Sequence, residues 1–166
     1  MEAVLATAIF AVFFAGLYAT NGRAMSMLKQ SVECTAATSS LQNRLERVRS
    51  STWEEITDPT HLRDKILSRP SDGERHMPKF SEIIAVNAYP EPAGYSSGQK
   101  VSATIEVARM SGGAATVTAF GNGTLATAQA IRVDCTASWQ SGGTGTTRTR
   151  QVSTIISHGG LAGRNR

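Results

Sequence analysis

Few residues of this 166-residue chain have the types and spacing that chemistry requires. The histidines His61, His76 and His158 and the cysteines Cys34 and Cys135 show neither the Cys-x-x-Cys nor the His-x-x-x-His spacing of a zinc site. The glycine-rich stretches GNGTL and SGGTGTT lack the lysine of a phosphate-binding loop, and no serine lies in a nucleophile elbow. We therefore expect no metal, no cofactor, no catalytic residue and no enzyme.

Cys34 and Cys135 are candidates for a disulfide. On a helix Cys34 shares one face with four residues at steps of three and four: Thr38, Leu41, Leu45 and Val48. On a strand Cys135 lies on the apolar side with Val133 and Ala137. Both sulfurs therefore point toward one core. A disulfide between them would stabilise the fold by up to ~4.7 kcal/mol in the chain-entropy model, because of the long loop that it closes. Two free thiols that pack as small apolar groups are an equal alternative.

Basic residues gather only near the end of the chain. The net charge is +4, and from Ser141 onward four arginines occur with no acid: Arg148, Arg150, Arg164 and Arg166. Such a patch could bind an anion or DNA. A solvated strand face and a loose tail explain it equally well, so we do not expect a nucleic-acid partner.

Glu2 precedes an apolar run, Ala3 to Thr20, that contains no other charge. As a helix the run is roughly 27 Å long, close to the thickness of a bilayer core. The run is therefore a candidate membrane span. A signal peptide would carry a basic start, which is absent here, and a buried core helix would need a larger soluble part. Glu2 is either a paired functional group or a carboxylate solvated among headgroups.

The helical pattern continues beyond the span. From Met25 to Arg49 there is no proline, and one apolar stripe passes through Leu28, Cys34, Leu41, Leu45 and Val48. Five charged residues are expected largely elsewhere: Lys29, Glu33, Arg44, Glu46 and Arg47. The sequence predicts one helix over residues 1–50, with its transmembrane half at 3–20. Gly16 and the Asn21-Gly22 pair are its weak points.

A polar connector over residues 51–79 follows the helix. Asp58 is expected to cap a short helix that begins at Pro59 and ends before Pro70. Residues 80–159 then carry five runs rich in β-branched residues: Phe80–Tyr89, Val101–Met110, Ala115–Phe120, Ala126–Gln140 and Gln151–His158. Residues 160–166 form a tail.

These runs predict an antiparallel sheet of four or so strands, giving an α+β fold in which the sheet covers the helix. Ser141 to Gly145 is expected to form a hairpin loop. The Ser111-Gly112-Gly113 and Gly121-Asn122-Gly123 segments either join strands or interrupt one. The apolar face should include Ile131, Val133, Trp139 and Ile155.

Two segments resemble type IV pilins and the pseudopilins of type II secretion. The run from Glu2 to Ala11, EAVLATAIFA, looks like the core of the prepilin signature. The run from Leu41 to Arg49, LQNRLERVR, is similar to a segment of minor pilins and minor pseudopilins. The likeness covers residues 1–50 well and the rest in outline. It implies a pilin-like α+β fold and a structural subunit, of the minor kind, that assembles into a filament.

The resemblance also implies roles for residues. Glu2 would pair with the N-terminal amine of a neighbouring subunit, and five apolar residues would pack between subunits: Val4, Leu5, Ile9, Phe10 and Phe13. The family carries a basic leader that a prepilin peptidase removes before methylating the new amine. We expect this sequence to start inside such a leader-bearing chain. The leader would outweigh Arg23 and Lys29 and place the sheet in the periplasm.

The expected partners are thus the inner membrane, the peptidase and other pilin or pseudopilin subunits. Two alternatives remain open. The chain is a membrane-tethered binding module that does not polymerise, or it is a DNA-binding minor pilin that uses the arginine patch.

Overall fold

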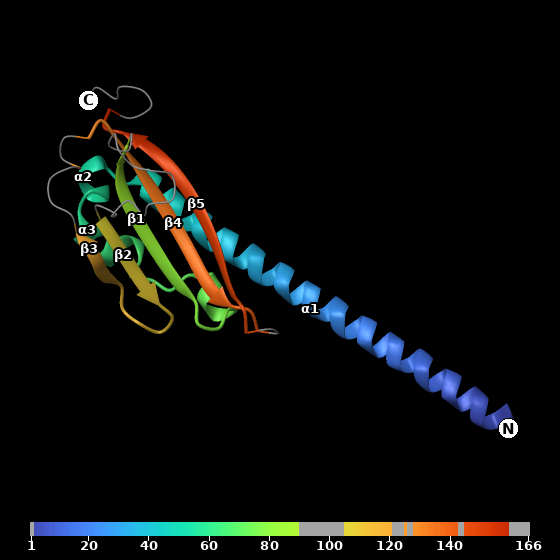
Figure 1. Ribbon diagram of the computed structural model, residues 1–166. Helices are drawn as coiled ribbons and strands as arrows, with labels where there is room; N and C mark the ends of the chain where they lie inside the picture. The colour runs from blue at the N-terminus through green and yellow to red at the C-terminus, as the bar shows by residue number, and fades with distance from the viewer. Residues whose placement is uncertain (1, 90–104, 121–124, 126–127, 143–144, 160–166) are drawn as a thin grey trace.

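The computed structural model describes residues 2–89, 105–120, 125, 128–142 and 145–159 (Figure 1). Its helical elements are α1 (Glu2–Ser50), α2 (Trp53–Ile56), α3 (Pro59–His61), the π-helix η1 (Leu62–Ile66) and the 3-10 helix η2 (Asp72–Arg75). Its strands are β1 (Ser81–Tyr89), β2 (Ile105–Met110), β3 (Thr116–Phe120), β4 (Ala130–Gln140) and β5 (Thr147–Ser157). The predicted single helix of about fifty residues is confirmed, as is the α+β class.

The sheet is antiparallel and has five strands in the order β3-β2-β1-β4-β5, rather than four or so. The predicted hairpin joins β4 to β5, where the Ser141 amide donates to the Thr146 carbonyl at 2.9 Å. Gly145 supplies the positive φ of 67° that this turn needs. The segment at Ser111 to Gly113 joins β2 to β3 and does not interrupt one strand, and Gly112 has φ 72°.

Strand bounds differ from the prediction mainly at polar ends. β5 begins at Thr147 rather than Gln151, because its ladder with β4 runs to the Gln140–Thr147 pair. Arg148 and Arg150 are polar, so this part of the strand lacks the apolar pattern on which the prediction relied. Several parts of the predicted features lie outside the described residues: 101–104, the turn at 121–123, 126–127, 143–144 of the hairpin loop, and the tail 160–166.

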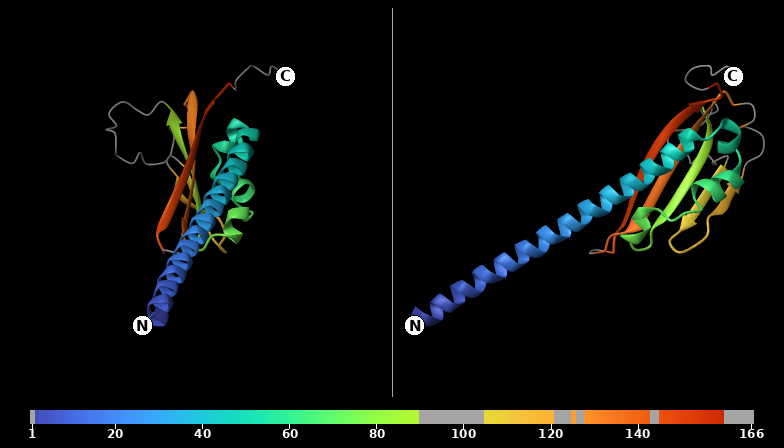
Figure 2. Two further views of the ribbon diagram at one scale, coloured as in Figure 1. Left: turned by 90° about the vertical axis from the view of Figure 1, so that its right-hand side faces the viewer. Right: turned by 180° about the vertical axis from the view of Figure 1, so that it is seen from behind.

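Helix α1 and the connector cover the same face of the sheet, which makes a two-layer structure (Figure 2). The core between the layers is apolar. It is built from the second half of α1, the connector and the inward positions of the strands, among them Leu41, Val48, Leu62, Leu67, Ile84, Val107, Val133 and Trp139. The sheet therefore supplies the cover that the helix stripe requires.

The predicted face of α1 was wrong at two charged residues. Glu33 and Arg44 are buried, with 2% and 3% exposure, on the face of α1 that contacts the sheet. Leu28, assigned to the stripe, is 62% exposed. The reason is geometric: Glu33, Ala37 and Arg44 follow helical spacing with the other buried residues of α1. Leu28 lies nine residues before Ala37, which places it on the opposite side of the helix.

Ile155 was also wrongly placed on the apolar face. It is 53% exposed and pairs with Arg132 of β4. Its neighbours Val152 and Ile156 pack against the core instead, opposite Cys135 and Ile131. In a run where Ile155 and Ile156 are adjacent, side-chain alternation admits only one of them to the core, and the register with β4 selects Ile156.

The connector helix is confirmed in detail. The Asp58 carboxylate accepts from the Thr60 amide at 2.8 Å, and Pro59 occupies the first helical position. The π-helix η1 continues this turn and ends before Pro70. A capping box at Thr52 and Glu55, which starts α2, was not predicted. The Thr52 amide donates to Glu55 at 2.8 Å and lowers the pKa of that carboxyl.

Candidate functional site

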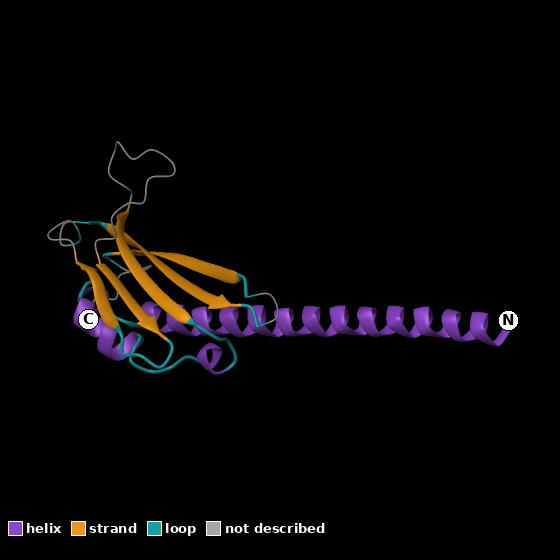
Figure 3. Ribbon diagram, turned by 60° about the horizontal axis from the view of Figure 1, so that its bottom comes forward, coloured by secondary structure: helices purple, strands orange, loops and turns teal. Residues whose placement is uncertain are grey.

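The N-terminal half of α1 projects from the sheet (Figure 3). Residues 2–25 are all exposed, and the first buried residue of the helix is Glu33. At about 1.5 Å per residue, more than 40 Å of helix lies beyond the layers. Its apolar window has a mean hydropathy of 2.0 with 0% of it buried. Among the described residues, α1 is the helix that is long and apolar enough to cross a membrane.

The large apolar side chains of this half are spread around the helix. The five predicted assembly residues Val4, Leu5, Ile9, Phe10 and Phe13 are between 59% and 74% exposed. At 100° per residue they occupy several directions instead of one stripe. Such a helix is stable where apolar surroundings enclose it on most sides, as in lipid or among other helices.

A row of alanines lies along one side of this half of the helix. Ala8, Ala11, Ala15 and Ala19 are spaced by three or four residues and so lie along one side. At Gly16, a Cβ atom would meet nothing within 4 Å. The glycine is therefore not required by contacts within the described chain.

The two threonine hydroxyls of the projecting half are hydrogen-bonded within the helix. The Thr7 hydroxyl donates to the Ala3 carbonyl at 3.0 Å, and the Thr20 hydroxyl donates to the Gly16 carbonyl at 2.8 Å. These bonds lower the cost of placing a hydroxyl in an apolar medium. The Glu2 carboxylate, by contrast, is exposed in the first turn and has no partner in the part of the chain that the structure describes.

A buried carboxylate holds α1 where it leaves the sheet. Glu33 accepts from the Trp139 indole nitrogen at 3.3 Å and from the Gly142 amide at 3.4 Å. These contacts join α1 to the β4–β5 hairpin. Sequence reasoning missed them, although Glu33 lies at the same helical spacing as Ala37 and Arg44 and so on the face that turns inward.

A second buried network joins α1, β1 and the connector. Arg44 pairs with Glu82 at 2.8 Å, and Glu82 also accepts from the Ser40 hydroxyl at 2.7 Å. The same guanidinium donates to the carbonyls of Ile66 and Arg69. These bonds fix the connector relative to the helix, because each needs both elements in place.

Arg109 of β2 makes a similar set of contacts with the connector. It pairs with Glu74 at 3.3 Å and donates to the carbonyls of Leu67 and Ser68 at 3.0 and 2.6 Å. Two buried arginines thus bind the four consecutive carbonyls of residues 66–69, where the π-helix η1 ends. Cations are favourable at that end of a helix, where carbonyls lack helical partners.

Cys34 and Cys135 are not bonded to each other in the structure. Cys135 is buried in β4, and Cys34 is half-buried on the flank of α1 that faces β5. Burial, followed by the charges of Glu82 and Asp134, raises the pKa of Cys135 to about 12. This thiol is therefore protonated at neutral pH and inert as a nucleophile.

The predicted arginine patch is only partly described. Arg148 of β5 donates to the side-chain oxygen of Gln30 at 2.8 Å and so ties the strand to α1. Arg150 is exposed beside Cys34 and Thr38 at a shallow groove. Arg164 and Arg166 lie outside the described residues. The structure thus brings Arg148 and Arg150 to the flank of α1.

In the described ranges, no three His, Cys, Asp or Glu side chains gather as metal ligands do. Comparisons of the chain with protein families, with curated proteins and with solved structures find no match.

Proposed function

We propose that this chain is a minor structural subunit of a type IV pilus or of a type II secretion pseudopilus. In this proposal α1 first spans the inner membrane with the sheet in the periplasm, and then moves into a helical filament. The observation that carries the proposal is that the apolar half of α1 is unburied and continues without a break into the half that packs on the sheet.

The layout agrees with the resemblance of the sequence. A long N-terminal helix with an apolar first half, packed by its second half on an antiparallel sheet, is the plan expected of a pilin. The Glu33 and Arg44 contacts fix the position of the helix relative to the sheet. A subunit of a filament needs this rigidity, since its helix and its sheet must both meet neighbours.

The exposed apolar surface extends beyond a membrane-length segment. Met25, Leu28 and Val32 lie at steps of three and four, and each is between 62% and 64% exposed. They follow the Ala3 to Thr20 run, so a single span would leave them in water. Exposed apolar rows of this kind mark contact surfaces. A plain membrane tether does not explain them, whereas packing between subunits does.

Glu2 has a defined role in this proposal. Its carboxylate pairs with the N-terminal amine of a neighbouring subunit, so that neither charge is left alone when the helices leave lipid. A buried polar pair also fixes the axial register of packed helices. The absence of a partner for Glu2 among the described residues agrees with a partner on another chain.

The test is the Glu2→Gln variant, expressed in the source organism and followed by shearing filaments from the cells. We expect the variant to insert in the membrane as the wild type does but to be lost from the sheared fraction. Glu46→Gln, which removes an exposed carboxylate from the same helix, should be recovered normally.

Equal recovery of wild type and Glu2→Gln in the sheared fraction would contradict the role of Glu2. If the wild type itself stays wholly in the membrane, the chain is a tethered module and the filament proposal is wrong. DNA binding through the predicted arginine patch is not proposed, because Arg148 is engaged with Gln30 and Arg164 and Arg166 lie outside the described residues.

A further inference from the structure

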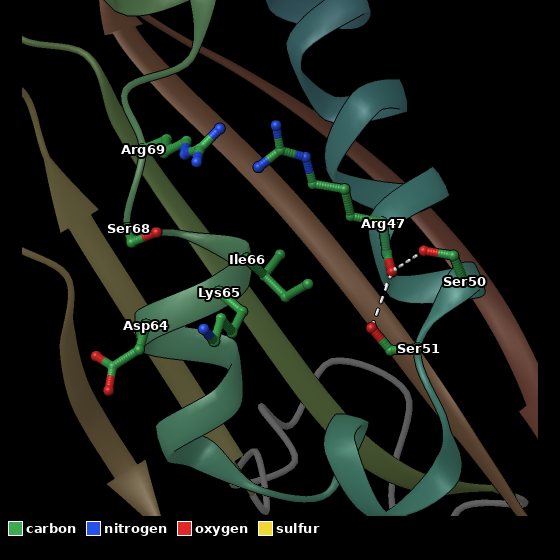
Figure 4. Close-up of a pocket in the computed structure, with 8 residues that line it drawn as sticks. All are labelled: Arg47, Ser50, Ser51, Asp64, Lys65, Ile66, Ser68 and Arg69. Carbon is green, nitrogen blue, oxygen red and sulfur yellow. Dashed lines mark hydrogen bonds between the residues drawn. The ribbon is translucent and has the colours of Figure 1, made fainter.

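A polar groove of about 410 Å³ lies between the C-terminal end of α1 and the connector (Figure 4). Helix α1 contributes Arg47, and the serines Ser50 and Ser51 follow at its end. The opposite wall carries Lys65, Ser68 and Arg69. None of these side chains takes part in the helix surface discussed above, so the groove has no role in the proposed assembly.

The groove is strongly cationic. Arg47, Lys65 and Arg69 are exposed, and their side chains have no ion-pair or hydrogen-bond partner among the described residues. Figure 4 shows the guanidinium groups of Arg47 and Arg69 directed toward each other from opposite walls. Two like charges placed this way repel, and an anion between them would relieve the repulsion.

The one acid at the groove does not neutralise it. Asp64 is bound by its neighbour Arg63 through two bonds, of 2.6 and 2.9 Å. In Figure 4 its carboxylate is directed away from Arg47 and Arg69. The hydroxyls of Ser50 and Ser51 both donate to the Arg47 carbonyl, at 2.8 and 3.0 Å. That carbonyl is therefore already occupied.

The buried arginines shape the second wall. The carbonyls of Ile66 and Arg69 accept from Arg44, and those of Leu67 and Ser68 accept from Arg109. These four oxygens are occupied from within the fold. The wall therefore presents cations without competing carbonyl oxygens, and it is held in place before any ligand arrives.

The position of the groove restricts its ligand. Arg47 lies twenty-seven residues after Thr20 on one helix, about 40 Å along its axis. Electrostatic screening acts over about 10 Å at 0.1 M salt. Headgroups of a membrane spanned by α1 are therefore out of reach, and the ligand is a soluble molecule.

We propose that this groove binds a soluble oxyanion carrying at least two negative charges, either a phosphate or a carboxylate group. Arg47 and Arg69 contact it from the two walls, as guanidinium forks match both groups, and Lys65 adds a third charge. The groove lies on described residues apart from the projecting helix, so this inference stands or fails separately from the filament proposal.

The test uses the full chain in non-ionic detergent micelles and isothermal titration calorimetry with two probes, tripolyphosphate and citrate. We expect saturable binding of at least one probe. The Arg47→Gln/Arg69→Gln variant should weaken it by at least about tenfold. The matched control Arg23→Gln/Arg75→Gln removes the same charge from exposed positions outside the groove and should change affinity less than about twofold.

A preference for tripolyphosphate assigns the site to phosphate, and a preference for citrate assigns it to carboxylate. No saturable binding of either probe overturns the proposal, as does an equal loss in the control variant. Tryptophan fluorescence in urea checks that each variant folds. If the double variant is unfolded, Lys65→Gln replaces it, because Lys65 is exposed and makes no contact that folding needs; unchanged affinity in that variant also overturns the proposal.

Discussion

Arg44 and Glu82 pair at 2.8 Å with side chains only 4% and 3% exposed. A charge buried this deeply is tolerated because its partner and its hydrogen bonds replace water. Removing one member leaves the other charged and unpaired. The cost of that change exceeds the net value of the pair.

We predict that Glu82→Gln destabilises the protein by about 3 kcal/mol or more. The measurement is urea unfolding of the full chain in micelles, followed by tryptophan fluorescence, to which the buried Trp139 at the helix contact contributes. The matched control is Glu46→Gln, whose pair with Arg49 is exposed at 3.1 Å and should cost less than about 1 kcal/mol. Equal losses in the two variants would contradict the network described for Arg44.

The two thiols should behave differently toward alkylation. We predict that iodoacetamide modifies Cys34 in the folded protein at pH 8 and reaches Cys135 only after unfolding, because Cys135 is buried and Cys34 is half-buried. The pKa of Cys135 rises from 9.0 to about 12 on folding, so the folded state keeps a proton that the unfolded state loses. This contribution to stability is present below pH 9 and is lost as pH rises toward 12.

Peptide mass spectrometry after alkylation measures both thiols in one sample. Equal labelling of Cys34 and Cys135 in the folded state would contradict the buried position of Cys135. A native mass lower by two hydrogens without reducing agent would contradict the two free thiols, since it would show a disulfide between them.

At the scale of residues, the spacing of residues along a helix or strand predicts the buried positions better than apolar character alone does. Glu33 and Arg44 on α1, Glu82 on β1 and Arg109 on β2 all occupy inward positions of their helix or strand. Their charge argued against burial, and the sequence does not show which opposite charge or carbonyl will meet them. Those partners come from other elements, as with Glu82 for Arg44. The available signal for these buried charges was a charged residue at a position that helix or strand spacing places in the core.

At the scale of elements, α1 was the most predictable part because its pattern is local. Its length, from Glu2 to Ser50, follows from the absence of proline and from helical spacing. Gly16 and Gly22 did not interrupt it, since an isolated glycine costs a helix only about 1 kcal/mol. The ends of β5 and the side chosen by Ile155 were less predictable, because register with β4 decides them.

The exposed apolar row on α1, formed by Met25, Leu28 and Val32, leads to a prediction for this helix. Leu28→Ser should leave folding unchanged, because the side chain is 62% exposed, and should lower recovery in sheared filaments severalfold. Met110→Ser is the matched control: its side chain is 73% exposed on β2, away from α1, and recovery should not change. A loss in both variants, or in neither, would argue against packing through this row.

At the scale of the whole molecule, the structure combines an unburied apolar half-helix with a sheet that is covered on one face. The contact of α1 with β4, β5 and the connector begins at Gln30, so more than half of the helix has no partner in another element of the described chain. Folding of this chain alone leaves that apolar surface uncovered, which agrees with the proposal that lipid and then other subunits enclose it. Sequence indicated this division, because the apolar run and the amphipathic run meet near Asn21 and Gly22.

The account as a whole depends on prepilin-type processing. The most direct measurement is mass spectrometry of the N-terminal peptide of the protein isolated from native membranes and sheared filaments. We predict a chain that begins a few residues before Met1, carries a methylated amino group, and occurs in both fractions. An unmethylated Met1 terminus, found only in the membrane fraction, would contradict assembly and leave a tethered membrane protein.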